Sequence, residues 1–122
     1  MIDTIEIPMG IKTLNQTLRE HWAVKKREKG LWKMFIRSEM RKQKLKDATK
    51  GQKFKLSMLH IRPARRKIKD YDNMVGGSKI VQDCLTGEGF LWDDTMDFIG
   101  IPKHTQIIGK ELKTIISREY GK

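Results

Sequence analysis

The 122-residue sequence predicts a single α+β domain, in which a small mixed or antiparallel sheet carries two main helices. Short apolar runs bounded by turn-forming residues predict four strands, and two longer stretches rich in helix-forming residues predict the helices. The expected order of elements along the chain is β-α-β-α-β-β. One domain is expected to span residues 1–122, because no repeat or low-complexity linker divides them.

The first half of the chain predicts two strands separated by a long helix. The alternating residues 2–8, which end in proline, predict the first strand, and residues 10–20 predict a loop. Residues 22–46 predict the long helix, which Gly30 is in a position to interrupt, and residues 54–61 a central strand. The apolar face of the long helix is expected to follow the residues at helical spacing, Leu31, Met34, Phe35 and Ser38.

The second half predicts another helix and two further strands. Residues 73–85 predict the helix, and residues 97–101 and 112–117 predict strands joined by a turn. Steps of 100° per residue place charged side chains along one line of this helix and apolar side chains on the opposite, core-facing side. The charged set is Asp72, Lys79 and Asp83, and the apolar set is Met74, Val81 and Leu85.

The charge of the chain is strongly positive and unevenly distributed. The formal net charge is +11, but residues 1–69 carry +14 and residues 70–122 carry −3. Seven acidic residues lie within residues 70–97, where Lys79 is the one cation. The excess of basic residues favours a polyanion as partner, and a bound divalent cation would let the acidic stretch approach phosphates. Charge alone leaves open a general nucleic-acid binder with a solvated acidic face.

Other features narrow the class of protein. A single cysteine, Cys84, allows no intrachain disulfide and suits a reducing compartment. The sequence contains neither a signal-peptide pattern nor an apolar run of membrane-spanning length, so we expect a soluble, cytoplasmic protein. The histidines, His21, His60 and His104, are scattered and give no zinc-binding spacing.

Paired carboxylates from two segments suggest a metal site. Asp70 and Asp72 flank one tyrosine, so in an extended chain both carboxylates would point to the same side about 6–7 Å apart. Asp93 and Asp94 come from a separate segment. Together with Lys79, such carboxylates are typical of a Mg²⁺-dependent phosphodiesterase, in which the metal activates water and the phosphate.

Each of these residues also has a purely structural interpretation. Asp72 alone fits a helix N-cap, and Asp93 with Asp94 fits a turn. Lys79 alone fits a solvated surface lysine, and Asp83 fits an intrahelical partner for it. Only the joint arrangement in a basic chain points to catalysis.

The same residues resemble the RusA family of Holliday junction resolvases. The family pattern is a basic run, D-x-D-N, a lysine and D-x-L in the following helix, and an aromatic lead into paired aspartates. The chain carries this pattern closely over residues 62–103. A weaker similarity lies in residues 8–22, at Asn15 and at the aromatic-basic segment His21-Trp22. Three more residues, including two glycines, separate D-x-D-N from the lysine than in the best-known member. The matching stretches are residues 65–73, 77–79, 83–85 and 89–94.

The resemblance implies a RusA-like fold and a homodimer that uses Mg²⁺, with Mn²⁺ as a substitute, to cut four-way DNA junctions by symmetric paired nicks in recombination and repair. It places the metal on Asp70, Asp72 and Asp94, and the catalytic lysine on Lys79. We expect Asp93 to assist these ligands, Asn73 to orient the carboxylates or contact DNA, and polar or basic residues to bind branched DNA. The expected DNA-binding residues are Asn15, Lys25, Lys26, Arg27, Arg65, Arg66, Lys67 and Lys69.

Two other functions remain open at this point. The chain could be a non-catalytic protein that binds branched or single-stranded DNA. An RNA-binding module is a weaker alternative, because the sequence has neither the aromatic pattern of an RRM nor a KH loop.

Overall fold

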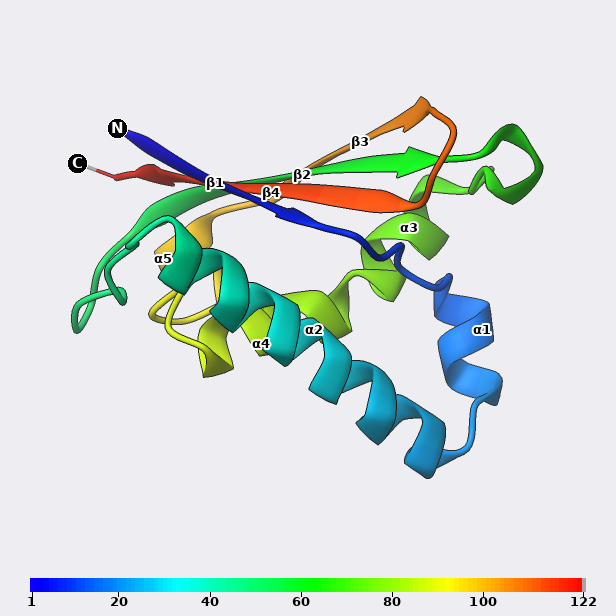
Figure 1. Cartoon of the computed structure of the whole chain (residues 1–122), viewed down its shortest axis with the longest axis horizontal. Helices are drawn as coiled ribbons and strands as arrows, with labels where there is room; N and C mark the ends of the chain where they lie inside the picture. Colours follow the sequence, from blue (N-terminus) through cyan, green and yellow to red (C-terminus); the bar gives the residue numbers. More distant parts are fainter. Residues whose placement is uncertain (122) are drawn as a thin grey trace.

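A computed structural model describes residues 1–121 and places all the helices on one side of a four-stranded mixed sheet (Figure 1). This arrangement confirms the expected α+β class. The strand order is β1-β4-β2-β3, with β4 antiparallel to both of its neighbours and β3 parallel to β2. The strands are β1 (Ile2–Ile7), β2 (Phe54–Arg62), β3 (Lys103–Ile108) and β4 (Lys113–Tyr120).

The link from β3 to β4 passes the end of β2, which lies between them in the sheet. Gly109 in this link donates its backbone N–H to the Arg62 carbonyl. A Cβ on Gly109 would lie only 2.5 Å from Cγ2 of Ile61, so the link approaches β2 more closely than another residue would allow.

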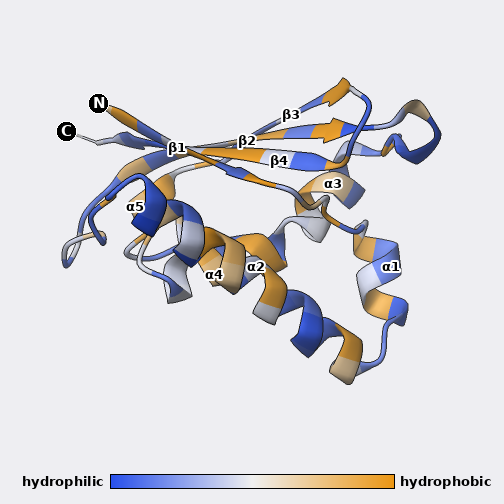
Figure 2. Ribbon diagram, in the orientation of Figure 1, coloured by the Kyte–Doolittle hydropathy of each residue, from blue (hydrophilic) through white to orange (hydrophobic). Residues whose placement is uncertain are grey.

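Alternation along the strands buries one face of the sheet beneath the helices, and Figure 2 shows hydrophobic and hydrophilic residues taking turns along them. The helices supply the rest of the core. The opposite face of the sheet is formed by exposed or half-buried side chains. The buried apolar residues of the strands are Ile5, Ile7, Phe54, Leu56, Met58 and Ile116.

A short helix, α1 (Leu14–Arg19), lies where a loop was expected. Thr13 begins it with a capping box: its hydroxyl accepts from the Gln16 backbone N–H at 3.2 Å, and Gln16 Oε1 accepts from the Thr13 N–H at 2.9 Å. This reciprocal pair satisfies two donors that a helix start otherwise leaves unpaired. The prediction of a loop was therefore wrong, and the T-x-x-Q spacing was the overlooked signal.

The long helix is confirmed as α2 (Trp22–Lys42), although it ends four residues earlier than expected and Gly30 does not interrupt it. The predicted apolar face was wrong. Of its members, Phe35 alone packs against the core, whereas Leu31 and Met34 are 40% and 54% exposed and Ser38 is exposed. The residues that α2 buries are Trp32, Ile36 and Met40.

The predicted single helix over residues 73–85 is two helices, α3 (Tyr71–Gly77) and α4 (Lys79–Gly87), separated at Ser78. At this break the end of α3 packs closely against the N-terminal segment around Lys12. A Cβ on Gly77 would lie 1.8 Å from the Lys12 carbonyl oxygen, so only glycine fits there.

The break changes the two expected faces differently. Met74, Val81 and Leu85 are all buried, as predicted. The straight charged line was wrong, because Asp72 belongs to α3 and Lys79 to α4, so the 100° steps do not continue from one to the other.

The strand expected at residues 97–101 is also wrong. These residues form α5 (Met96–Ile99), which Gly100 ends with a φ of 61°, and β3 begins only at Lys103. A short 3₁₀ turn, η1 (Ala64–Arg66), follows β2. No helix among the described residues is both long and apolar enough to cross a membrane.

Candidate metal and nucleic-acid site

Lys79 and Asp94 meet although they come from different segments. Lys79 is the first residue of α4, and Asp94 lies in the link between α4 and α5. The Lys79 ammonium nitrogen lies 3.4 Å from Oδ2 of Asp94, with the Asp94 side chain 17% exposed and that of Lys79 65% exposed. The structure thus brings together two of the predicted catalytic residues at the edge of α4.

Asp83 is a third member of this group. The pKa of Asp83 is raised, first because neighbouring atoms partly desolvate its carboxylate, and then because the Asp94 carboxylate lies close enough to share a proton with it and to repel its charge. The charges of Lys79 and Lys29 oppose the shift. Two carboxylates and an ammonium therefore converge beside α4, and the sequence interpretation missed the contact between Asp83 and Asp94. The signals for Asp83 were its place one turn after Lys79 and its position in the D-x-L stretch at residues 83–85.

Asp70 and Asp72 begin α3 rather than forming an extended pair. Oδ1 of Asp70 accepts the backbone N–H of Asp72 at 2.9 Å, which makes Asp70 the N-cap. Asp72 lies in the first helical turn, so the expectation of two carboxylates on one side of an extended segment was wrong, as was the alternative that Asp72 itself is the cap. Both residues are exposed.

The two residues expected to assist the metal ligands, Asp93 and Asn73, lie in turns of the backbone next to those ligands. Oδ1 of Asp93 accepts the backbone N–H of Thr95 at 3.2 Å, which stabilises the turn before α5. Asn73 is half-buried in the first turn of α3. Asp93 thus makes a turn contact, whereas its neighbour Asp94 reaches Lys79.

The three predicted metal ligands do not form one cluster in this structure. Within residues 1–121, no group of three or more histidine, cysteine or carboxylate side chains lies close enough together to hold a metal ion. Asp94 lies with Lys79 and Asp83, whereas Asp70 and Asp72 occupy the start of the neighbouring helix.

Arg118 fixes the segment that leads to Asp94. Its guanidinium is fully buried in β4 and donates to Oδ2 of Asp3 at 2.9 Å and to the Phe90 carbonyl at 2.8 Å. A third bond, 2.6 Å long, joins it to the Lys46 carbonyl. The guanidinium carbon also lies 4.6 Å from the centre of the Phe90 ring. One buried cation therefore holds the sheet, the loop after α2 and the approach to Asp94 together.

The basic segment after β2 is anchored from within. Arg62 is buried and donates to the carbonyls of Arg66 and Ile11, each at 2.7 Å. The side-chain amide of Gln106 in β3 both donates to and accepts from the backbone of Ile68, at 2.9 Å in each case. These bonds hold the backbone while the predicted DNA-binding side chains Arg65, Arg66, Lys67 and Lys69 stay exposed.

The other predicted DNA-binding residues lie on α1 and α2. Asn15 is exposed on α1, which packs against α3 and so lies beside the helix that carries Asp72. On α2, Lys26 and Arg27 are exposed and Lys25 is half-buried.

The fold also creates a histidine pair that the scattered sequence positions did not suggest. His60 and His104 are buried on the parallel neighbours β2 and β3. Nε2 of His60 lies 3.2 Å from Nδ1 of His104, and the ring planes differ by 9°. The outer nitrogens, Nδ1 of His60 and Nε2 of His104, have no hydrogen-bond partner in the described part of the chain. Burial, together with the nearby charges of His104 and Arg62, lowers the pKa of His60 to about 4.

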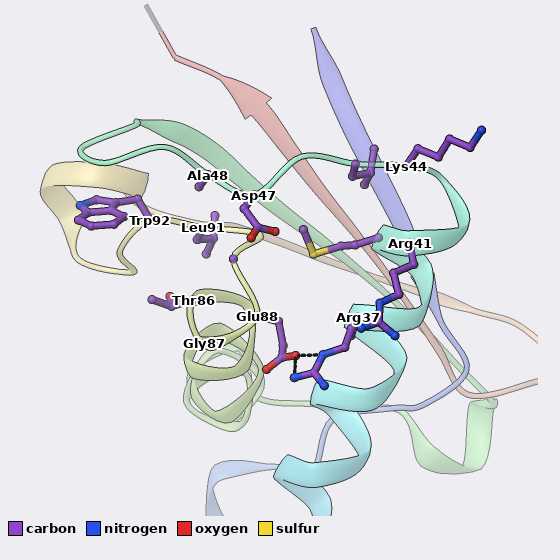
Figure 3. A pocket seen from close by; sticks show the side chains of 13 residues that line it. Arg37, Arg41, Lys44, Asp47, Ala48, Thr86, Gly87, Glu88, Leu91 and Trp92 are labelled. Atoms are coloured by element: carbon purple, nitrogen blue, oxygen red, sulfur yellow. Dashed lines mark hydrogen bonds and ion pairs between the residues drawn. The ribbon is translucent and has the colours of Figure 1, made fainter.

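A groove of about 550 Å³ lies between the C-terminal end of α2 and the segment after α4 (Figure 3). Arg37 and Arg41 come from α2, and Trp92 stands at the opposite side of the groove. The charge here is partly neutralised, because Arg37 pairs with the nearly buried Glu88 at 2.6 Å.

No protein-family model matches the chain, and no curated protein is significantly similar to it. The resemblance to the RusA family therefore rests on the motif residues themselves.

Proposed function

We propose that this protein is a Mg²⁺-dependent endonuclease that cuts branched DNA such as four-way junctions. The observation that carries the proposal is the meeting of Lys79, Asp94 and Asp83 at one edge of α4 in a chain of net charge +11. Adjacent carboxylates repel each other, and a divalent cation relieves that repulsion while attracting a phosphate.

The donor chemistry suits a hard cation. Mg²⁺ takes oxygen ligands, keeps several of its waters, and is commonly bound by one or two carboxylates together with phosphate oxygens. Asp70, Asp72 and Asp94 would hold the ion, although the described residues do not bring these three carboxylates into one cluster, and phosphate oxygens of the DNA would complete its coordination. When bound, the ion would make a nucleophile of water and polarise the phosphoryl oxygen, and Mn²⁺ would substitute for it.

The chain's own residues supply positioning and charge. Lys79 is exposed enough to contact the scissile phosphate and would stabilise the negative charge that develops on it. Asp93 holds the turn that presents Asp94, and Arg118 holds the segment before it. The basic segment at residues 65–69 would bind phosphates of the DNA arms without reading their sequence.

The choice of junction DNA and of a homodimer comes from the resemblance to the RusA family. Physical symmetry favours the same choice, because a four-way junction has an approximate two-fold axis and a C₂ dimer presents two identical sites about such an axis. Paired nicks would follow from that symmetry.

One observation favours the non-catalytic alternative, a protein that binds branched or single-stranded DNA. Asp70 caps α3 and Asp93 caps a turn, so both carboxylates already have structural roles. A basic protein in which these carboxylates serve only the fold would bind DNA without cutting it.

Incubation of a synthetic four-way junction with the protein, in Mg²⁺ or in EDTA, separates the two. Cleavage that requires the metal supports the nuclease, and binding without cleavage in either Mg²⁺ or Mn²⁺ selects the alternative. Asp94→Asn is expected to lower the cleavage rate by at least about 100-fold while junction binding, measured by gel shift in Ca²⁺, is retained. Glu111→Gln, which removes the same charge from an exposed turn, should cleave at the wild-type rate. Loss of binding in Asp94→Asn would instead indicate a structural role for this aspartate.

A further inference from the structure

A second groove, of about 420 Å³, lies between α1, the N-terminal half of α2 and the start of α4. Ile80 lines it and directly follows Lys79, so the groove reaches the helical turn that carries the proposed catalytic lysine. The lining residues are Thr17, Trp22, Lys25, Lys26, Lys29 and Ile80.

Trp22 leaves an aromatic face open to solvent in this groove. The side chain is 68% exposed at the first position of α2, in contrast to Trp32, which is 2% exposed in the core. Its ring packs beside the His21 ring, with the ring centroids 5.5 Å apart and the ring planes tilted by 37°. An indole held on a helix and left uncovered is suited to stacking against a planar ligand.

The charged side chains that line this groove are all positive. Lys25, Lys26 and Lys29 line the groove and no carboxylate does. None of these three lysines forms an ion pair with the described residues. Lys29 also lies close enough to Asp83 for its charge to act on that carboxylate, which links the groove to the candidate site.

We propose that this groove binds single-stranded DNA, with Trp22 stacked on a base and the three lysines on the flanking phosphates. An aromatic platform among cations is the combination that binds single strands without reading their sequence. A duplex would not fit, because its bases are already stacked and their faces are covered. The inference deepens the proposed function and rests on it for the choice of DNA: the groove would take the unpaired nucleotides at a branch point.

The groove in Figure 3 is the natural comparison. It also combines an exposed tryptophan, Trp92, with cations, but Glu88 and Asp47 share its lining and Arg37 is paired with Glu88. Charge complementarity to a phosphate chain is therefore stronger at Trp22 than at Trp92. This difference supplies a matched control.

The test is the affinity for a fluorescein-labelled thymidine oligonucleotide, measured by fluorescence anisotropy in EDTA. Trp22→Ala should weaken binding by about 5- to 150-fold, the range that base–aromatic stacking produces, and Trp22→Phe should recover most of it. Trp92→Ala should bind like the wild-type protein. Unchanged affinity in Trp22→Ala with native circular dichroism would overturn the proposal, as would an equal loss in Trp92→Ala. Tighter binding to a duplex or to a uridine oligonucleotide would overturn the assignment to single-stranded DNA.

The lysines are tested by salt dependence. For single strands each phosphate contact contributes about 0.7 to the slope of log affinity against log salt, so replacing Lys25, Lys26 and Lys29 together by alanine should reduce the slope by about 2. Lys50→Ala, in the exposed loop before β2, should leave the slope unchanged. An unchanged slope in the triple variant would contradict phosphate binding in this groove.

Cleavage assays on the same variants separate this inference from the proposed function. Wild-type affinity for single strands in Trp22→Ala, with Mg²⁺-dependent junction cleavage intact, refutes the groove alone. Loss of affinity in Trp22→Ala, in a protein that never cleaves, refutes the nuclease and leaves the groove as the site of a binding protein.

Discussion

Acidification is expected to destabilise the fold through His60. Its imidazole is buried on β2 against His104, and its pKa is lowered from the usual 6.5 to about 4. The unfolded chain therefore binds a proton on this histidine below about pH 6.5, whereas the folded chain binds it only near pH 4. Above pH 6.5 this residue causes no loss of stability. The loss appears as the pH falls through 6.5 and is complete below 4.

The size of the effect follows from the two pKa values. A shift from 6.5 to about 4 corresponds to a total loss of about 3 kcal/mol, of which about 2 kcal/mol should be present at pH 5. Burial lowers the pKa of His104 as well, so protonation of this second histidine acts in the same direction.

Urea denaturation followed by circular dichroism at pH 7.5 and pH 5 measures this loss. His60→Gln removes the titrating group, so its unfolding free energy should change between the two pH values by about 2 kcal/mol less than that of the wild-type protein. Carboxylates titrate in both proteins and cancel in the comparison. An NMR titration of the His60 ring should show it neutral at pH 5. Equal pH dependence in the two proteins, or a ring that titrates near pH 6.5, would refute the assignment of a buried neutral pair.

Urea denaturation at pH 7.5 also tests three substitutions. Arg118→Met should lower the unfolding free energy by about 3–5 kcal/mol, because it leaves the Asp3 carboxylate buried without its cation. A cost below about 1 kcal/mol would show that Arg118 does not hold these segments together. Gly77→Ala should cost at least about 2 kcal/mol, because its Cβ would overlap the Lys12 carbonyl oxygen. Gly30→Ala should instead stabilise α2 by about 0.5–1 kcal/mol, since nothing lies within 4 Å of the added methyl group; equal effects of the two glycine substitutions would contradict the packing at the α3–α4 break.

The candidate site was only partly predictable. Lys79 and Asp94 could be selected because their residue types and order fit a recognisable motif, and the structure pairs them. The contact of Asp83 with Asp94 was not predictable, because the link from α4 to α5 returns to α4 and brings together residues 11 positions apart. The open stacking face of Trp22 was equally hidden, since whether an indole is buried depends on which helix face meets the sheet.

The sequence by itself determined the strand alternation, the long helix, the basic charge and the residue types available for catalysis, because these depend on local periodicity and composition. Tertiary structure decided the rest. Packing decided that α2 buries the face with Trp32 and Ile36 and exposes the face with Leu31 and Met34. Both sets of apolar residues repeat at helical spacing, so only the contacts of α2 with the sheet and α4 distinguish them. Tertiary structure also divided one predicted helix at Ser78, next to Gly77, whose backbone lies so close to the Lys12 carbonyl oxygen that no side chain fits there.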